Sequence, residues 1–218
     1  MSAPIIGITV DQHEKRFRVS FAYADAVVTA GGIPILLPPI LGQEKHFMTL
    51  CDGFVFTGGD DPKMETWNLT THEKATPVAK ERQEFELSLL QKLQKMPNVP
   101  VLGVCLGMQW MGLLAGGSLE QDLPEPLASH HGAGEHKVAG SIGEGIVHTH
   151  HHQALTNAGS LTVVASADDG VIEAVRDESR SWYVGVQWHP ERTKDHQLGQ
   201  GLFEQLLTAA IFKKHTNA

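Results

Sequence analysis

The chain has 218 residues, of which 41% are hydrophobic, and its formal net charge at pH 7 is −8. This size and composition predict a single globular domain over residues 1–218, and the acidic balance argues against a nucleic-acid partner. No apolar run approaches the ~20 residues that span a bilayer, and the start of the chain lacks the pattern of a signal peptide. The two cysteines make no disulfide framework, which favours a cytoplasmic protein. From the charge and the apolar runs we expect that it binds neither nucleic acid nor a membrane.

Short apolar runs alternate with helical patterns through the first half of the chain. The expected strands are Ile5–Val10, Ile33–Leu37, Gly53–Thr57 and Val101–Val104. The expected helices lie near Val19–Ala30, Glu44–Cys51, Lys80–Lys95 and Leu106–Ala115. This alternation predicts an α/β fold with a mostly parallel central sheet that helices cover on both faces.

The second half of the chain changes character. Its expected elements are the strands Leu161–Ala165, Val171–Arg176 and Trp182–Trp188 and an amphipathic helix at Leu198–Phe212. Asp169 and Gly170 form a pair that is typical of a hairpin turn, so we expect an added antiparallel hairpin region. Between the halves, the Gly-, His- and Pro-rich segment Glu120–Gly145 is expected to be mostly loop and to cover a site.

Cys105 lies where the expected strand Val101–Val104 turns into a helix, with Gly103 and Gly107 on either side. This is the spacing of a nucleophile elbow in a G-x-C-x-G form, in which a tight turn presents the side chain at the carboxyl edge of the sheet. The start of the following helix favours a thiolate at this position. The motif alone is equally compatible with a cysteine packed in a small-residue turn, so it needs a partner.

Candidate partners stand in the stretch GVQWHPE at positions 185–191. His189 ends an expected strand, and Glu191 follows it across Pro190, which fixes the local backbone. Side chains two residues apart in an extended chain point the same way, so Glu191 can bond one imidazole nitrogen while the other faces a thiol. A nucleophile, a base and an orienting carboxylate are the components of covalent acyl transfer. Cys105, His189 and Glu191 are therefore the candidate catalytic residues.

An oxyanion hole is expected from two backbone amides. The strand at Gly53–Thr57 runs into Gly58 and Gly59, whose N–H groups can approach a ligand closely. The amide of Leu106, the residue after Cys105, is the expected second donor. Gly59 and Leu106 are thus the predicted oxyanion donors.

Several stretches together resemble a known family. TGGDD (57–61), GVCLGMQ (103–109) and GVQWHPE (185–191), in this order, are similar to the class I glutamine amidotransferase superfamily, and most closely to its γ-glutamyl-γ-aminobutyrate hydrolase branch, which is peptidase C26-like. AGGIPILLP (30–38), HHQ (151–153) and DGVIEA (169–174) resemble further segments of that branch, so the resemblance covers nearly the whole chain. It implies a flavodoxin-like α/β fold and a Cys-His-Glu triad that acts on a γ-glutamyl amide without a cofactor.

The resemblance also implies where a small-molecule γ-glutamyl substrate would lie. Gln109 occupies the place where the superfamily holds the glutamyl end. The other residues expected to line the substrate pocket are Gly58, His151, His152 and Gln153. The family's Asn-Ser-Leu before HHQ is here His148, Thr149 and His150. This departure and others in nearby loops leave the amine half of the substrate open.

Other functions stay open beside hydrolysis of γ-glutamyl amides. The chain could be a glutaminase that delivers ammonia to a separate synthase, or a non-catalytic binding or regulatory protein on the same scaffold. The related proteases and glyoxalase-like proteins usually carry histidine where Leu106 stands, which argues against that branch. The sequence does not decide the oligomeric state and is compatible with a homodimer.

The histidine run at positions 148–152 is the one pattern that suggests a metal. Alternate histidines on a strand share a face, as metal ligands must. No Asp, Glu or Cys lies near the run in the sequence to complete a closed site, and the HHQ segment already accounts for two histidines as pocket lining. We therefore expect no functional metal and favour an adventitious one acquired during purification. The sequence does not decide whether the run binds a metal, to which His130, His131 and His136 could add ligands.

Overall fold

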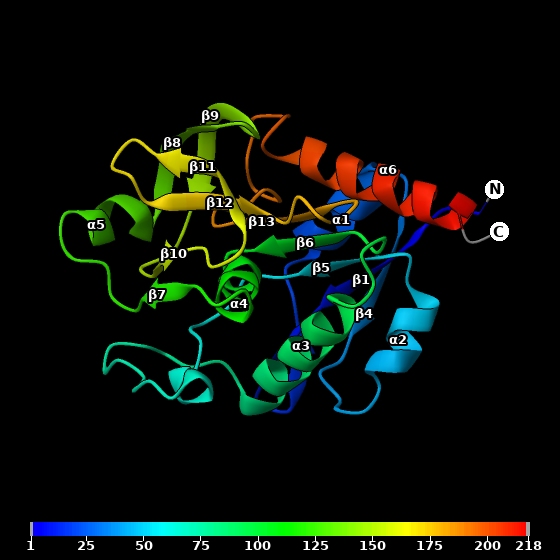
Figure 1. The fold of residues 1–218 in the computed structure, drawn as a ribbon, viewed down its shortest axis with the longest axis horizontal. Coiled ribbons are helices and arrows are strands. Elements are labelled where there is room, and N and C mark those ends of the chain that lie inside the picture. The colour runs from blue at the N-terminus through cyan, green and yellow to red at the C-terminus, as the bar shows by residue number, and fades with distance from the viewer. Residues whose placement is uncertain (1, 217–218) are drawn as a thin grey trace.

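The computed structural model describes residues 2–216 and has one large central sheet (Figure 1). Within the described residues this sheet has nine strands. In spatial order they are β4 (Ile33–Leu37), β1 (Ile5–Thr9), β5 (Gly53–Phe56), β6 (Val101–Val104), β13 (Tyr183–Val186), β12 (Ile172–Arg176), β11 (Thr162–Ala167), β8 (Gly134–Gly140) and β9 (Gly143–Thr149). From β4 to β13 the strands pair in parallel, and from β13 to β9 they pair antiparallel. The expected α/β class is confirmed, with an antiparallel part that extends beyond one hairpin.

Helices cover both faces of the parallel part of the sheet (Figure 1). One face carries α1 (Phe21–Thr29) and α6 (Gln200–Thr216), and the other carries α2 (Glu44–Leu50), α3 (Lys80–Leu93) and α4 (Leu106–Leu114). Val27 and Phe203 are buried in the core on the first face, and Phe85 and Trp110 in the core on the second. Among the helices of the described chain, none has both the length and the apolar run that a membrane crossing requires.

The sequence pattern explains these elements locally. Phe85, Leu89 and Leu93 recur at helical spacing on α3, and all three are fully buried. Helix α1 begins after Ser20, whose hydroxyl accepts a hydrogen bond from the N–H of Ala22, as an N-cap does. Every residue of β5, β6 and β13 is buried, as expected for strands covered on both faces.

The segment Glu120–Gly145 is more regular than its composition predicts. It contains α5 (Leu127–Gly132), all of β8 and the start of β9, so the expectation that it is mostly loop is wrong. β8 and β9 pair over seven residues each, and Gly140 and Gly143 close this hairpin. The sequence conceals the strands because glycine and histidine interrupt their apolar alternation.

Shorter elements lie outside the large sheet. In the described part of the chain, two small antiparallel pairs join β2 (Asp11–His13) to β3 (Arg16–Arg18) and β7 (Ser118–Glu120) to β10 (Ala154–Asn157). A 3-10 turn, η1, spans Met64–Trp67. None of these short elements was expected from the sequence.

Gly107 marks the closest approach of α4 to the sheet. A Cβ at this position would lie 2.3 Å from the carbonyl oxygen of Phe56 in β5, a backbone atom that cannot move aside cheaply. We therefore expect Gly107→Ala to lower the free energy of unfolding by about 1–3 kcal/mol in urea denaturation. Gly132→Ala is the matched control, because a Cβ built there meets nothing within 4 Å. Equal losses in the two variants would contradict this close approach.

Candidate active site

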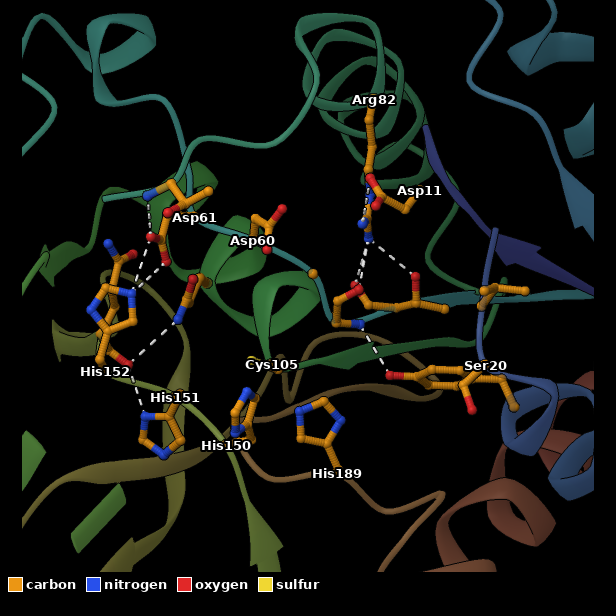
Figure 2. Close-up of a pocket in the computed structure, with 18 of the residues that line it drawn as sticks. Asp11, Ser20, Asp60, Asp61, Arg82, Cys105, His150, His151, His152 and His189 are labelled. Carbon is orange, nitrogen blue, oxygen red and sulfur yellow. Dashed lines mark hydrogen bonds and ion pairs between the residues drawn. The ribbon is translucent and has the colours of Figure 1, made fainter. Parts of the chain in front are cut away.

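A cavity of about 620 Å³ opens at the carboxyl ends of β5 and β6 (Figure 2). Open α/β sheets carry their functional groups at this edge. The predicted site residues that line the cavity are Gly58, Gly59, Cys105, Gln109, His151, His152, Gln153 and His189. Leu106 and Glu191 are buried beside Cys105 and His189 instead. The structure therefore brings the predicted residues together around one cavity.

Cys105 occupies a strained turn between β6 and α4. Its φ of 50° and ψ of −103° lie in a region that residues with a side chain rarely adopt, as in a nucleophile elbow. Its N–H donates to the carbonyl oxygen of Val186 at 2.8 Å, which ties the turn to β13. The side-chain amide of Gln187 donates toward the Cys105 Sγ at 3.4 Å. The thiol is thus fixed at the wall of the cavity.

His189 is held by Glu191 and lies opposite Cys105. The distance between His189 Nδ1 and Glu191 Oε1 is 2.8 Å. A Cβ built on Gly58 would lie 2.9 Å from His189 Cε1 and 3.4 Å from Cys105 Cβ, so the two side chains meet at this glycine. Burial alone would lower the pKa of His189, but the adjacent Cys105 and Glu191 outweigh burial and raise it to about 9. The arrangement therefore places an imidazolium beside the Cys105 side chain.

The raised pKa of His189 predicts a pH-dependent contribution to stability. The imidazole titrates at 6.5 when unperturbed and at about 9 in the folded chain. The stabilisation is therefore complete below pH 6.5 and is lost as the pH rises through 9. NMR titration of the His189 ring should give a pKa of about 9 in the parent and a lower pKa in Glu191→Gln. A pKa near 6.5 in both proteins would contradict the observed contact.

A buried arginine holds the glycine loop. Arg82 Nη2 donates to the carbonyl oxygens of Thr57 and Gly58, each at 3.0 Å. Because N–H and C=O point in opposite directions across a trans peptide, the N–H groups of Gly58 and Gly59 point away from Arg82. The Gly58 N–H donates to Tyr23 Oη at 3.1 Å, on the side where Tyr23 borders the cavity. The Gly59 N–H is thereby turned to the same side.

The other predicted pocket residues are held by side chains and backbone around the cavity. Gln109 Nε2 lies 3.3 Å from Gln187 Oε1. His152 Nε2 lies 3.0 Å from Asp61 Oδ1 (Figure 2). Gln153 Nε2 donates to a neighbouring backbone carbonyl oxygen, while its Oε1 is buried and has no hydrogen-bond partner among the described residues. The buried Oε1 of Gln153 is therefore an unsatisfied acceptor in a residue that lines the cavity.

The histidine run lies beside carboxylates in space, contrary to the expectation from the sequence. His151 Nε2 is 3.4 Å from Oε1 of Glu173 on β12. His131, which lies outside the run but contacts His151, has its Nε2 3.0 Å from Oδ2 of Asp169 in the turn before β12. The expectation that no acidic residue lies near the run is therefore wrong. Sheet pairing brings these carboxylates close, and distance along the sequence does not predict it.

Gln187, Tyr23 and Arg82 are site residues that the sequence analysis missed. Gln187 stands two residues before His189 at the same strand end, and this spacing could have indicated that it faces the site. No sequence signal connects Tyr23 or Arg82 with Gly58, because α1, α3 and the glycine loop meet only through the fold.

The geometry defines a class of protein. A cysteine on a strand-to-helix turn, opposite a histidine held by a glutamate at the carboxyl edge of a parallel sheet, is the arrangement of the class I glutamine amidotransferase superfamily. A solved structure of a candidate GMP synthase subunit from Thermoplasma acidophilum has a similar fold, with a TM-score of 0.71 over 100% of this chain and 99% of its own, at 18% sequence identity.

Sequence comparisons identify the family within this class. The peptidase C26 family model matches residues 4–191. A Mycobacterium tuberculosis protein named as a candidate glutamine amidotransferase is 32% identical over 96% of this chain and 75% of its own. A γ-glutamyl-γ-aminobutyrate hydrolase of Escherichia coli K12 is 25% identical over 96% of this chain and 94% of its own. The chain belongs to the peptidase C26 family, and its relatives indicate a hydrolase-type enzyme.

Proposed function

We propose that this chain hydrolyses γ-glutamyl amide bonds, with Cys105 as the nucleophile, and releases glutamate and an amine. The observation that carries the proposal is the placement of His189 between Glu191 and Cys105 at the cavity wall. The name of the E. coli relative states a γ-glutamyl substrate and supports the same bond type. Neither catalytic step requires a cofactor.

In the first step the thiolate of Cys105 attacks the γ-carbonyl carbon and forms a C–S bond. The carbonyl oxygen becomes an oxyanion, which the N–H groups of Gly59 and Leu106 stabilise. The imidazolium of His189 gives its proton to the amide nitrogen. The C–N bond then breaks, the amine leaves, and a γ-glutamyl thioester remains on Cys105.

In the second step water attacks the thioester carbonyl carbon. His189 takes one proton from this water, and the same two amides stabilise the new oxyanion. The C–S bond breaks, glutamate leaves, and the Cys105 thiolate and the His189 imidazolium are restored. Glu191 keeps the imidazole ring oriented in both steps without transferring a proton itself.

The glutamyl end of the substrate fits the side of the cavity near Gln109 and Gln153. Both glutamines line the cavity, and an amide side chain can donate to a carboxylate or accept from an ammonium group. Gly58 lets the chain pass close to the reacting carbonyl, because a Cβ there would contact both His189 and Cys105. His152, held by Asp61, and His151 complete this wall.

The amine end of the substrate faces polar groups. Of the three residues that replace the family's Asn-Ser-Leu, His150 is exposed and borders the cavity, whereas Thr149 is buried and donates to a backbone carbonyl. We expect amines that carry a carboxylate or hydrogen-bonding groups to be preferred over alkyl amines. His150→Leu should reduce that preference by about tenfold to a hundredfold in kcat/KM. An unchanged rank order, as expected for the exposed control His46→Leu, would remove His150 from specificity.

Glutamate release from a panel of γ-glutamyl amines, γ-glutamyl peptides and glutamine tests the proposal. Preferred turnover of the amines or peptides is the expected result. A glutaminase is the second candidate, because the name of the 32% identical relative is that of a glutamine amidotransferase. Preferred turnover of glutamine would favour this second candidate, and no glutamate from any substrate would contradict both.

A further inference from the structure

A cluster of buried histidines surrounds one carboxylate behind the cavity wall. Its members are His131 on α5, His136 on β8, His151 after β9 and Glu173 on β12, and each is more than nine-tenths buried. Glu173 Oε1 lies 3.2 Å from His131 Nδ1, 3.3 Å from His136 Nε2 and 3.4 Å from His151 Nε2. Among the described residues no lysine or arginine pairs with Glu173. A carboxylate buried in this way requires a cation beside it.

Hydrogen bonds at the rim of the cluster show which ring nitrogen of His151 and of His131 carries the proton. The other nitrogen of each ring then faces the centre of the cluster as an acceptor. His151 Nδ1 lies 2.9 Å from the carbonyl oxygen of Gln153, which can only accept, so Nδ1 carries the proton and Nε2 carries a lone pair. His131 Nε2 lies 3.0 Å from the carboxylate of Asp169, so its proton is on Nε2 and Nδ1 carries a lone pair. In neutral histidines, two lone pairs therefore face each other and Glu173 at the centre.

The distances between these three acceptors match the edges of a metal coordination shell. His131 Nδ1 and His151 Nε2 are 3.2 Å apart, and each lies within 3.4 Å of Glu173 Oε1. Ligands roughly 2.0–2.1 Å from a tetrahedral Zn²⁺ are separated by about 3.3–3.4 Å from one another. We propose that His131, His151 and Glu173 bind a zinc-type divalent cation, since their ligand atoms all lie within 4.8 Å of one another.

The surroundings of the cluster also suit a metal. Histidines that ligate metals usually donate their other N–H to a carboxylate or a backbone carbonyl, as His131 does to Asp169 and His151 does to Gln153. His136 Nδ1 is buried without a hydrogen-bond partner in the described chain, and its Nε2 faces Glu173 Oε1 at 3.3 Å. Imidazole and carboxylate donors in this number suit Zn²⁺ better than Mg²⁺ or Ca²⁺, which prefer oxygen ligands.

The proposed ion has a structural role. It would join α5, the segment after β9 and β12. His151 borders the catalytic cavity as well as the cluster, so the ion would fix the cavity wall at residues 150–153. The proposal does not depend on the reaction that Cys105 performs, because its test reads metal content and stability.

Metal analysis of the full chain tests the proposal. The protein is purified without an affinity tag or metal resin, stripped with a chelator, incubated with Zn²⁺ and passed through a desalting column. We expect one Zn²⁺ per chain and a higher melting temperature than that of the stripped protein. His151→Gln and Glu173→Gln should lose both effects, whereas the adjacent control His150→Gln should keep them.

Two outcomes would overturn the proposal. The first is a parent chain that retains no zinc, in which case a proton on His131 neutralises Glu173. The second is zinc that the His150→Gln control loses as fully as His151→Gln does, which would indicate adventitious binding to the exposed run. If the Gln variants fail to fold, the absorption spectrum of Co²⁺ bound to the parent protein tests the proposal instead. Intense visible absorption from tetrahedral Co²⁺ supports the site, and the weak absorption of octahedral Co²⁺ contradicts it.

Discussion

Cys105→Ser is expected to lower kcat for γ-glutamyl hydrolysis by about 10⁴-fold or more. A serine hydroxyl is far less ionised than a thiol at neutral pH, and loss of a nucleophile costs a triad enzyme most of its rate enhancement. Because serine is close to cysteine in size, the fold should persist, and circular dichroism should be unchanged. Initial rates of glutamate release measure the loss. A variant that keeps more than about a tenth of the parent's kcat would remove Cys105 as the nucleophile.

The second cysteine is the matched control for this substitution. Cys51 is buried at the end of α2, and burial, followed by the charge of Asp52, raises the pKa of its thiol to about 12. Cys51→Ser should therefore retain kcat. In brief alkylation followed by mass spectrometry, Cys105 should be modified before Cys51. The reverse order would contradict the assignment of the reactive thiol.

His189→Ala is expected to be nearly as damaging as the loss of Cys105, and Glu191→Gln distinctly less so. His189 moves a proton in both proposed steps, whereas Glu191 only holds the ring through its contact at 2.8 Å. In comparable triads the orienting carboxylate contributes roughly tenfold to a hundredfold less than the base. We therefore expect kcat to rank parent, Glu191→Gln and His189→Ala, in decreasing order.

The pH profiles separate the two roles. Glu191→Gln should retain a bell-shaped rate profile whose histidine limb moves to lower pH, because the carboxylate helps to raise the pKa of His189. His189→Ala should lose that limb. If Glu191→Gln matched the parent in both kcat and pH profile, the carboxylate would have no part in the reaction.

The elements with strong apolar periodicity could be predicted from the sequence. β4 and β6 have the bounds that the sequence predicts, and α3 differs only at its C-terminal end, which comes at Leu93. The β8–β9 hairpin could not be predicted, because its glycines and histidines conceal a strand pattern. Apolar periodicity therefore predicts core elements better than strands that are rich in glycine and histidine.

Some residues of the candidate site could be predicted from the sequence and others could not. Cys105, His189 and Glu191 could be selected because each lies in a short motif whose spacing has a physical reason. Arg82 and Glu173 could not, because one supports the glycine loop from α3 and the other reaches the histidines through strand pairing. Contacts between segments that are distant in the sequence cannot be predicted until the fold is known.

The covalent intermediate is the most direct test of the account. The enzyme is mixed with a γ-glutamyl anilide, quenched with acid during the first turnover, digested and analysed by mass spectrometry. We expect the peptide containing Cys105 to gain the mass of one γ-glutamyl group, and we expect this gain to be absent from Cys105→Ser. Glutamate release without any modified Cys105 peptide, or with the group on another residue, would contradict it.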